Sequence, residues 1–80
     1  MTMPQQRTAQ LVYGHVAAAI AALVPTDQAT AWLDKAVTFY RQAERRLART
    51  DPGWEVGLIH RHVAAAIAAK ADRAKEPAPL

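Results

Sequence analysis

Three histidines, His15, His60 and His62, are the residues of this chain best suited to metal binding or proton transfer. Neutral imidazole is a common metal ligand, and its charge changes near neutral pH. His60 and His62 would lie about 160° apart around a helix, so they cannot hold one metal ion together. His15 and His62 could meet across a helix pair, but no carboxylate completes the three or four ligands of a typical site. We therefore expect boundary histidines at a helix interface, with no metal and no cofactor, and keep metal binding through His15 and His62 as a third alternative.

A group of arginines forms the second candidate site. It consists of Arg41, Arg45, Arg46 and Arg49. Three of them follow the i, i+4, i+8 spacing of one helix face, and only Glu44 opposes them, which gives residues 41–49 a net charge equal to the +3 of the whole chain. A basic helical stripe is typical of nucleic-acid binding, because cations release counterions from phosphates. However, Asp27 and Asp34 precede the arginines, as the helix dipole favours, and no nucleic-acid motif accompanies them. A solvated helix face is therefore the preferred interpretation.

Catalysis finds little support in the remaining residues. The chain has no cysteine and no serine, so thiol and serine nucleophiles, disulfides and zinc–thiolate sites are excluded. No glycine-rich phosphate loop is present. The seven carboxylates stand at cap and surface positions rather than in apolar surroundings that would raise a pKa. We expect the protein not to be an enzyme.

The elements that must position these residues are helices separated by two breaks. Pro25 disfavours helix before it, and Thr26 or Asp27 can cap the next helix. At the second break Asp51 is expected as the N-cap and Pro52 as the first helical residue. No stretch has the β-branched alternation of a strand. The single predicted domain, residues 1–80, comprises three helices at about 5–24, 27–50 and 52–74, with short flexible ends at 1–4 and 76–80.

Each predicted helix has an apolar stripe of helical period. In the first it consists of Val12, Val16, Ala19, Ile20 and Leu23. In the second it consists of Ala29, Trp32, Leu33, Ala36, Val37, Tyr40, Ala43 and Leu47. In the third it consists of Val56, Ile59, Val63, Ala66 and Ile67. Connections of two or three residues force neighbouring helices to run antiparallel. The sequence thus predicts an all-α, up-down-up bundle.

An eight-residue repeat relates the first and third helices. The segment HVAAAIAA occupies residues 15–22 and again 62–69, an offset of 47. The predicted helix starts differ by the same number. In an up-down-up bundle the two copies should therefore lie side by side at matching height, both packed on the second helix, with His15 level with His62. We interpret the repeat as one alanine-rich packing surface used twice.

A second facet of these two helices predicts a partner interface. It consists of Leu11, His15, Ala18, Ala22, Trp54, Leu58, His62, Ala65 and Ala69. The first helix carries a single charge, Arg7, although a surface helix normally has a charged outer face. A chain of this size also buries only roughly 60–65% of its unfolded surface, so association would supplement its core. We therefore expect a homodimer. Trp54 either folds back over its loop as a staple or anchors a partner.

The sequence as a whole predicts a small non-catalytic helical interaction or regulatory module. It would self-associate through the first and third helices and bind a protein partner that the sequence does not identify. The alternative is a nucleic-acid-binding accessory protein using the four arginines. The longest apolar stretch, fourteen residues from Leu11 to Val24, is shorter than the ~20 needed to span a bilayer. The first residues lack the pattern of a secretory signal. A cytoplasmic location, away from membranes, is expected.

Overall fold

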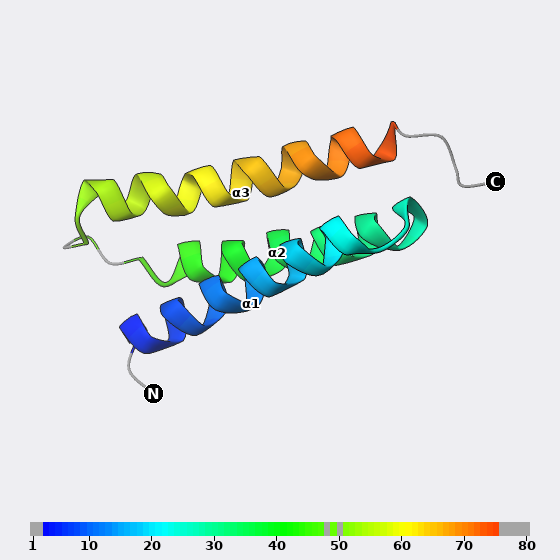
Figure 1. Ribbon diagram of the computed structural model, residues 1–80. Helices are drawn as coiled ribbons and strands as arrows, with labels where there is room; N and C mark the ends of the chain where they lie inside the picture. The colour runs from blue at the N-terminus through cyan, green and yellow to red at the C-terminus, as the bar shows by residue number, and fades with distance from the viewer. Residues whose placement is uncertain (1–2, 48, 50, 76–80) are drawn as a thin grey trace.

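The fold consists of three packed α-helices (Figure 1). The computed structural model describes residues 3–47, 49 and 51–75, and within them α1 spans Met3–Leu23, α2 spans Thr26–Arg45 and α3 spans Gly53–Ala74. This part of the chain contains no strand. None of its helices is long and apolar enough to cross a membrane. The predicted all-α class, with three helices packed together, is confirmed.

The second connection is longer than the sequence predicts. The link between α1 and α2 is two residues, as expected, but α2 ends at Arg45 rather than near residue 50. The backbone N–H groups of Arg46 and Leu47 close the helix with tight i→i−3 bonds to Ala43 and Glu44. Beyond this end of α2, Asp51 pairs with an arginine of α1. Tertiary contacts thus override the helix propensity of this segment.

Proline begins both later helices. Pro25 is the N-cap of α2, and its carbonyl accepts hydrogen bonds from the N–H groups of Gln28 and Ala29 at 2.9 Å. Pro52 is likewise the N-cap of α3, so the prediction of Asp51 as N-cap and Pro52 inside the helix is wrong by one residue. A capping proline fits because its fixed φ of −59° lies in the extended region with ψ near 150°. The Asp51 carboxylate is thereby available for a tertiary contact.

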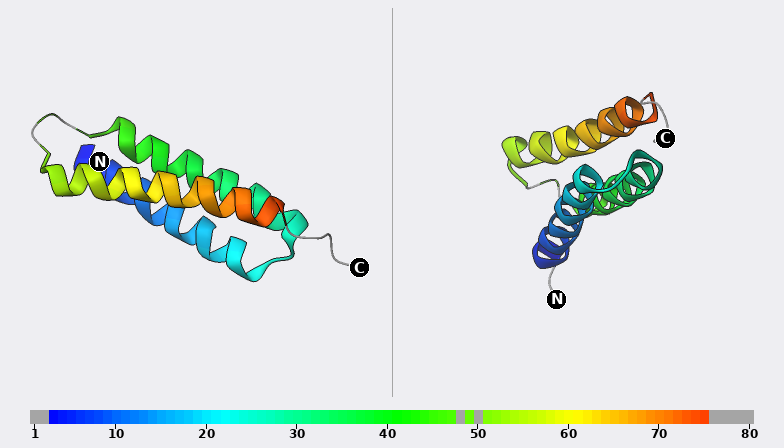
Figure 2. Two further views of the ribbon diagram at one scale, coloured as in Figure 1. Left: turned by 90° about the horizontal axis from the view of Figure 1, so that it is seen from above. Right: turned by 45° about the vertical axis from the view of Figure 1, so that its right-hand side comes forward.

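The apolar stripe predicted for α2 forms the centre of the core. Its buried members are Ala29, Leu33, Ala36, Tyr40 and Ala43. Seen from above, α3 runs over the other two helices, with α1 and α2 on either side beneath it (Figure 2). Among the described residues ten hydrophobic side chains are buried, and six of them are alanines. The helices therefore approach closely, but few large side chains hold them together.

The buried face of α1 is not the one that its hydrophobic pattern predicts. Against α2 it buries Gly14, Ala17 and Ala21. Two valines of the predicted stripe, Val12 and Val16, are half-exposed instead. Other members of that stripe, Ala19 and Leu23, are also exposed, whereas Ile20 is intermediate. The helix is therefore rotated so that its smallest side chains, rather than its largest, face the core.

Gly14 explains this rotation. A Cβ atom built on Gly14 would lie 2.5 Å from Cε1 of Tyr40 and 2.7 Å from Cδ1, well inside van der Waals contact. The tyrosine ring thus occupies the space that any other side chain would fill. Because α1 has ordinary negative φ at this position, the glycine is needed for close approach rather than for backbone conformation.

The stripe predicted for α3 is correct at its centre. Ile59, Val63 and Ala66 are buried, whereas Val56 is intermediate and Ile67 is exposed. The two copies of the repeat consequently pack with different faces. The offset of 47 pairs Val63 and Ala66, which are buried on α3, with the exposed Val16 and Ala19 of α1. At the position equivalent to Gly14, α3 carries Arg61, which cannot be buried against a tyrosine ring without a partner.

Two glycine substitutions test the close approach of α1 to α2. Gly14→Ala should destabilise the fold by ~1–3 kcal/mol, because the new methyl group overlaps the Tyr40 ring. Gly57→Ala is the matched control, since nothing lies within 4 Å of its added Cβ. It should stabilise the fold by up to about 1 kcal/mol, through helix propensity alone. Urea unfolding of both variants measures the difference, and equal midpoints would contradict this explanation.

Candidate functional site

Three aromatic and titratable side chains meet at the middle of the bundle, one from each helix. The ring centroids of His15 and His62 are 4.7 Å apart in an edge-on arrangement. Tyr40 stacks on His62 at 5.2 Å with an interplanar angle of 18°, and its hydroxyl lies 2.7 Å from Nδ1 of His15. The prediction that the two histidines lie level and close together is confirmed. The tyrosine between them was expected only as a core residue.

Burial shifts the pKa of two members of this cluster. It raises the pKa of Tyr40, so the hydroxyl stays protonated and donates a hydrogen bond to Nδ1 of His15. Burial also lowers the pKa of His62, and the charge of His15 lowers it further when that ring is protonated. Burial therefore favours the neutral form of the His62 imidazole at neutral pH. We call this hydrogen-bonded contact among the three helices the histidine junction, and we expect its stability to depend on pH.

The third histidine takes a separate role. His60 donates from Nδ1 to Oε2 of Glu44 at 2.7 Å, which links α3 to α2 on the exposed side of the bundle. Within residues 3–47, 49 and 51–75, no group of three His, Asp or Glu side chains is arranged to hold a metal ion.

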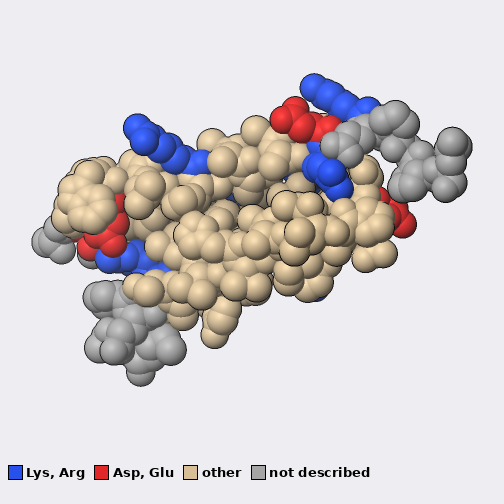
Figure 3. Space-filling model, viewed as in Figure 1, with Lys and Arg blue, Asp and Glu red and all other residues tan. Residues whose placement is uncertain are grey.

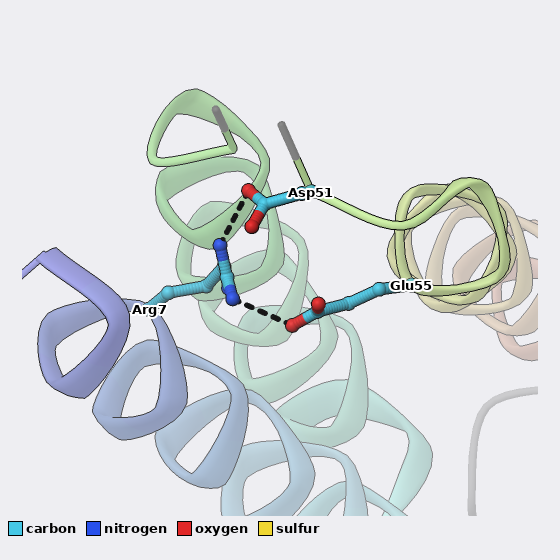
Figure 4. Close-up of polar contacts among 3 residues, drawn as sticks. All are labelled: Arg7, Asp51 and Glu55. Atoms are coloured by element: carbon cyan, nitrogen blue, oxygen red, sulfur yellow. Dashed lines mark hydrogen bonds and ion pairs between the residues drawn. The ribbon is translucent and has the colours of Figure 1, made fainter. Parts of the chain in front are cut away.

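A buried arginine connects the start of α1 to the start of α3. The guanidinium of Arg7 donates to Oδ2 of Asp51 at 2.7 Å and to Oε1 of Glu55 at 2.6 Å (Figure 4). Its side chain is only 10% exposed. Removing one partner of a buried ion pair typically costs ~3–5 kcal/mol, because a charge is left uncompensated. From sequence Arg7 was expected only as the lone charge of its helix, because acids 44 and 48 residues away give no local signal.

An open cleft lies between α1 and α3. Two adjoining hollows of about 290 and 240 Å³ share the walls Ala18 and Ala69 and the floor Leu33. At one end Arg73 donates from Nη2 to the carbonyl of Val24 at 3.0 Å. Alanines from both copies of the repeat thus face each other without filling the space between them.

The predicted partner interface is divided by this cleft. Leu11 and Ala18 pack against the core cluster that contains Tyr40, and Ala69 packs against the second core cluster, which contains Leu33. The exposed members are His15, Ala22, Trp54, Leu58 and Ala65. Trp54 is 72% exposed in the first turn of α3, so it does not fold back over the loop as a staple.

We use the term α1–α3 face for the exposed surface on the side of these helices away from α2. Its large apolar side chains are Val12, Val16, Leu23, Trp54 and Leu58, which are 42–86% exposed. Where this side is visible in Figure 3, uncharged residues cover its middle, and lysine, arginine, aspartate and glutamate lie toward the ends and upper rim. The face is therefore apolar over several helical turns.

The arginine stripe is shorter than predicted. Arg41 and Arg45 are exposed one turn apart on α2. Arg46 follows the helix, and its Nη1 donates back to the carbonyl of Gln42 at 2.8 Å. Arg49 lies in the loop, so it does not extend the helical i, i+4, i+8 row. The structure thus leaves two of the four arginines on the predicted face.

Comparison with known proteins adds no relative. No family model matches the chain, and neither a curated protein nor a solved structure matches it.

Acid should weaken the histidine junction. The folded-state pKa of His62 is lowered, so between that value and its unfolded value, about 6.5, the unfolded chain binds more protons. The stabilising contribution is thus complete above pH ~6.5 and is lost as the pH falls through the folded pKa. Urea unfolding between pH ~7.5 and ~5.5, above the range of ordinary carboxylates, measures the change. His62→Phe should reduce this pH dependence, and an unchanged profile would contradict the assignment.

Proposed function

We propose that this protein is a small, non-catalytic helical interaction module that self-associates through the α1–α3 face. Its place would be the cytoplasm, where it would act as a structural or regulatory partner of another protein. The observation that carries the proposal is the difference in size between the buried and the exposed hydrophobic side chains. Among the described residues only four buried hydrophobics are larger than alanine, whereas seven large hydrophobics are exposed. A monomer normally has the opposite distribution.

The placement of charge supports a second copy of the chain as the first partner. Copies with a net charge of +3 repel each other, so they associate best through a surface that carries no charge. The only charged residue of α1 is Arg7, which is buried between two carboxylates. The α1 part of the α1–α3 face can therefore meet its own copy without opposing like charges.

Self-association predicts a concentration-dependent mass. Light scattering or sedimentation at micromolar concentration should give a mass near twice the 8.7 kDa of one chain. Raising the salt should preserve or strengthen the association, because apolar burial is not screened. A mass of 8.7 kDa across the micromolar range would exclude this function.

Nucleic-acid binding is the second candidate, supported by Arg41 and Arg45. Both are exposed on α2, and no ion pair is found for either among the residues that the structure describes. Glu44, the one acid between them, is engaged with His60. Two adjacent cations can contact neighbouring phosphates, although they form a small site. We therefore expect weak binding that is independent of sequence.

Salt dependence tests this second candidate. The parent should bind a generic duplex weakly and lose affinity between about 50 and 200 mM salt. Arg45→Gln should reduce the log–log salt slope by about 0.9 if its phosphate contact is real. Arg61→Gln, which removes an exposed arginine from α3, is the matched control and should leave the slope unchanged. Tight binding that persists at the higher salt would make nucleic-acid binding the leading function.

A further inference from the structure

An exposed row on α1 has the spacing of a coiled-coil seam. It consists of Val12, Val16, Ala19 and Leu23. The intervals of four, three and four residues are those of alternating d and a positions in a heptad, and they keep the side chains on one side of a helix. The row covers about three turns, or ~17 Å at 1.5 Å per residue. It contains no charged residue and lies on the side of α1 away from α2.

The second copy of the repeat indicates what covers such a row. Residues Ile59, Val63 and Ala66 of α3 are the equivalents, at the offset of 47, of Val12, Val16 and Ala19. On α3 all three are buried, and Val63 and Ala66 pack in one core cluster with residues of the antiparallel helix α2. The same pattern on α1 is exposed, because Gly14 directs the opposite side of that helix toward Tyr40. By this internal comparison, the missing neighbour of the row is another antiparallel helix.

Of the three helices that a second copy of the chain offers, α1 is the one that fits this role. The outer side of α2 carries the charged residues Arg41 and Arg45, for which the described residues show no ion pair and which would be buried without partners. The row on α1 is uncharged and complementary to itself when two copies run antiparallel. Val12 then lies opposite Leu23 of the second copy, and Val16 lies opposite Ala19. Each layer pairs a larger with a smaller side chain, and a twofold axis passes between residues 17 and 18.

We propose that two copies of this chain associate through antiparallel pairing of their α1 helices along the row Val12, Val16, Ala19 and Leu23. This inference rests on the proposed self-association and specifies its surface and symmetry. The two α3 helices, with Trp54 and Leu58, then flank the central pair. The row takes the place of the facet predicted from sequence, of which Leu11 and Ala18 are used within the chain.

Charged substitutions test the surface. Val16→Glu and, separately, Ala19→Glu place carboxylates in the central layers, where they have no partner. Each should raise the dimer dissociation constant at least about 100-fold. Both sites are exposed within one chain, so the helical circular dichroism of the variants should persist. Ala64→Glu is the control: Ala64 is exposed on α3, within the second copy of the repeat, and its variant should dimerise like the parent.

Cysteine substitutions test the direction of pairing in a chain that has no natural cysteine. In the antiparallel pair residues 12 and 23 of opposite copies adjoin, whereas the two copies of residue 23 lie ~17 Å apart, too far for a disulfide. Val12→Cys combined with Leu23→Cys should therefore form a linked dimer on mild oxidation. Leu23→Cys alone should remain unlinked. Efficient linking of the single variant would indicate a parallel pair and overturn the inference.

The outcomes separate this inference from the function on which it rests. A parent chain that stays monomeric would remove both. A parent that dimerises while Val16→Glu and Ala19→Glu dimerise equally well would retain the function and overturn the α1 pairing. Leu58→Glu, on the flank of the proposed contact, should weaken the dimer less than Val16→Glu. The reverse order would place the centre of the interface on α3 and overturn the inference.

Discussion

The arrangement of this bundle depends on the contact between Tyr40 and Gly14. Tyr40 is the largest buried side chain of α2, and it reaches across to α1 at the one position without a Cβ atom. Its hydroxyl then meets His15, and its ring stacks on His62 of α3. One side chain therefore sets the rotation of α1 and contacts the histidines of both neighbouring helices. The alanines on either side allow the close approach, but they do not direct it.

This contact explains which parts of the fold the sequence predicts. On α2 large and small apolar residues share one stripe, so hydrophobic period and buried face agree. On α1 they diverge: the period follows Val12 and Val16, whereas packing selects Gly14 and Ala17. The hydrophobic period of a helix indicates where its apolar side chains gather, but it does not indicate how closely two helix backbones can approach. A glycine within an alanine-rich helix, spaced three and seven residues from Ala17 and Ala21, was the available signal for close packing.

The candidate site was predictable to the extent that it derives from the repeat. The offset of 47 residues places His15 level with His62, and the structure brings these rings together. The ion pairs of Arg7 could not be found in this way. They join α1 to Asp51 and Glu55, whose positions depend on the end of α2 at Arg45 rather than near residue 50. Such contacts depend on the exact end of a helix, the feature that sequence patterns define least well.

The links between α1 and α3 suit two helices that run in parallel. Their aligned dipoles repel each other, so oppositely charged groups at the ends offset part of this cost. Glu55 lies in the first turn of α3 and holds Arg7, while Arg73 in the last turn donates to the carbonyl of Val24 just beyond α1. Both ends are therefore fixed by charged hydrogen bonds. The middle of the two helices is held by aromatic contacts beside an open, alanine-lined cleft. This middle part has the fewest contacts to keep the helices together or to keep a partner out.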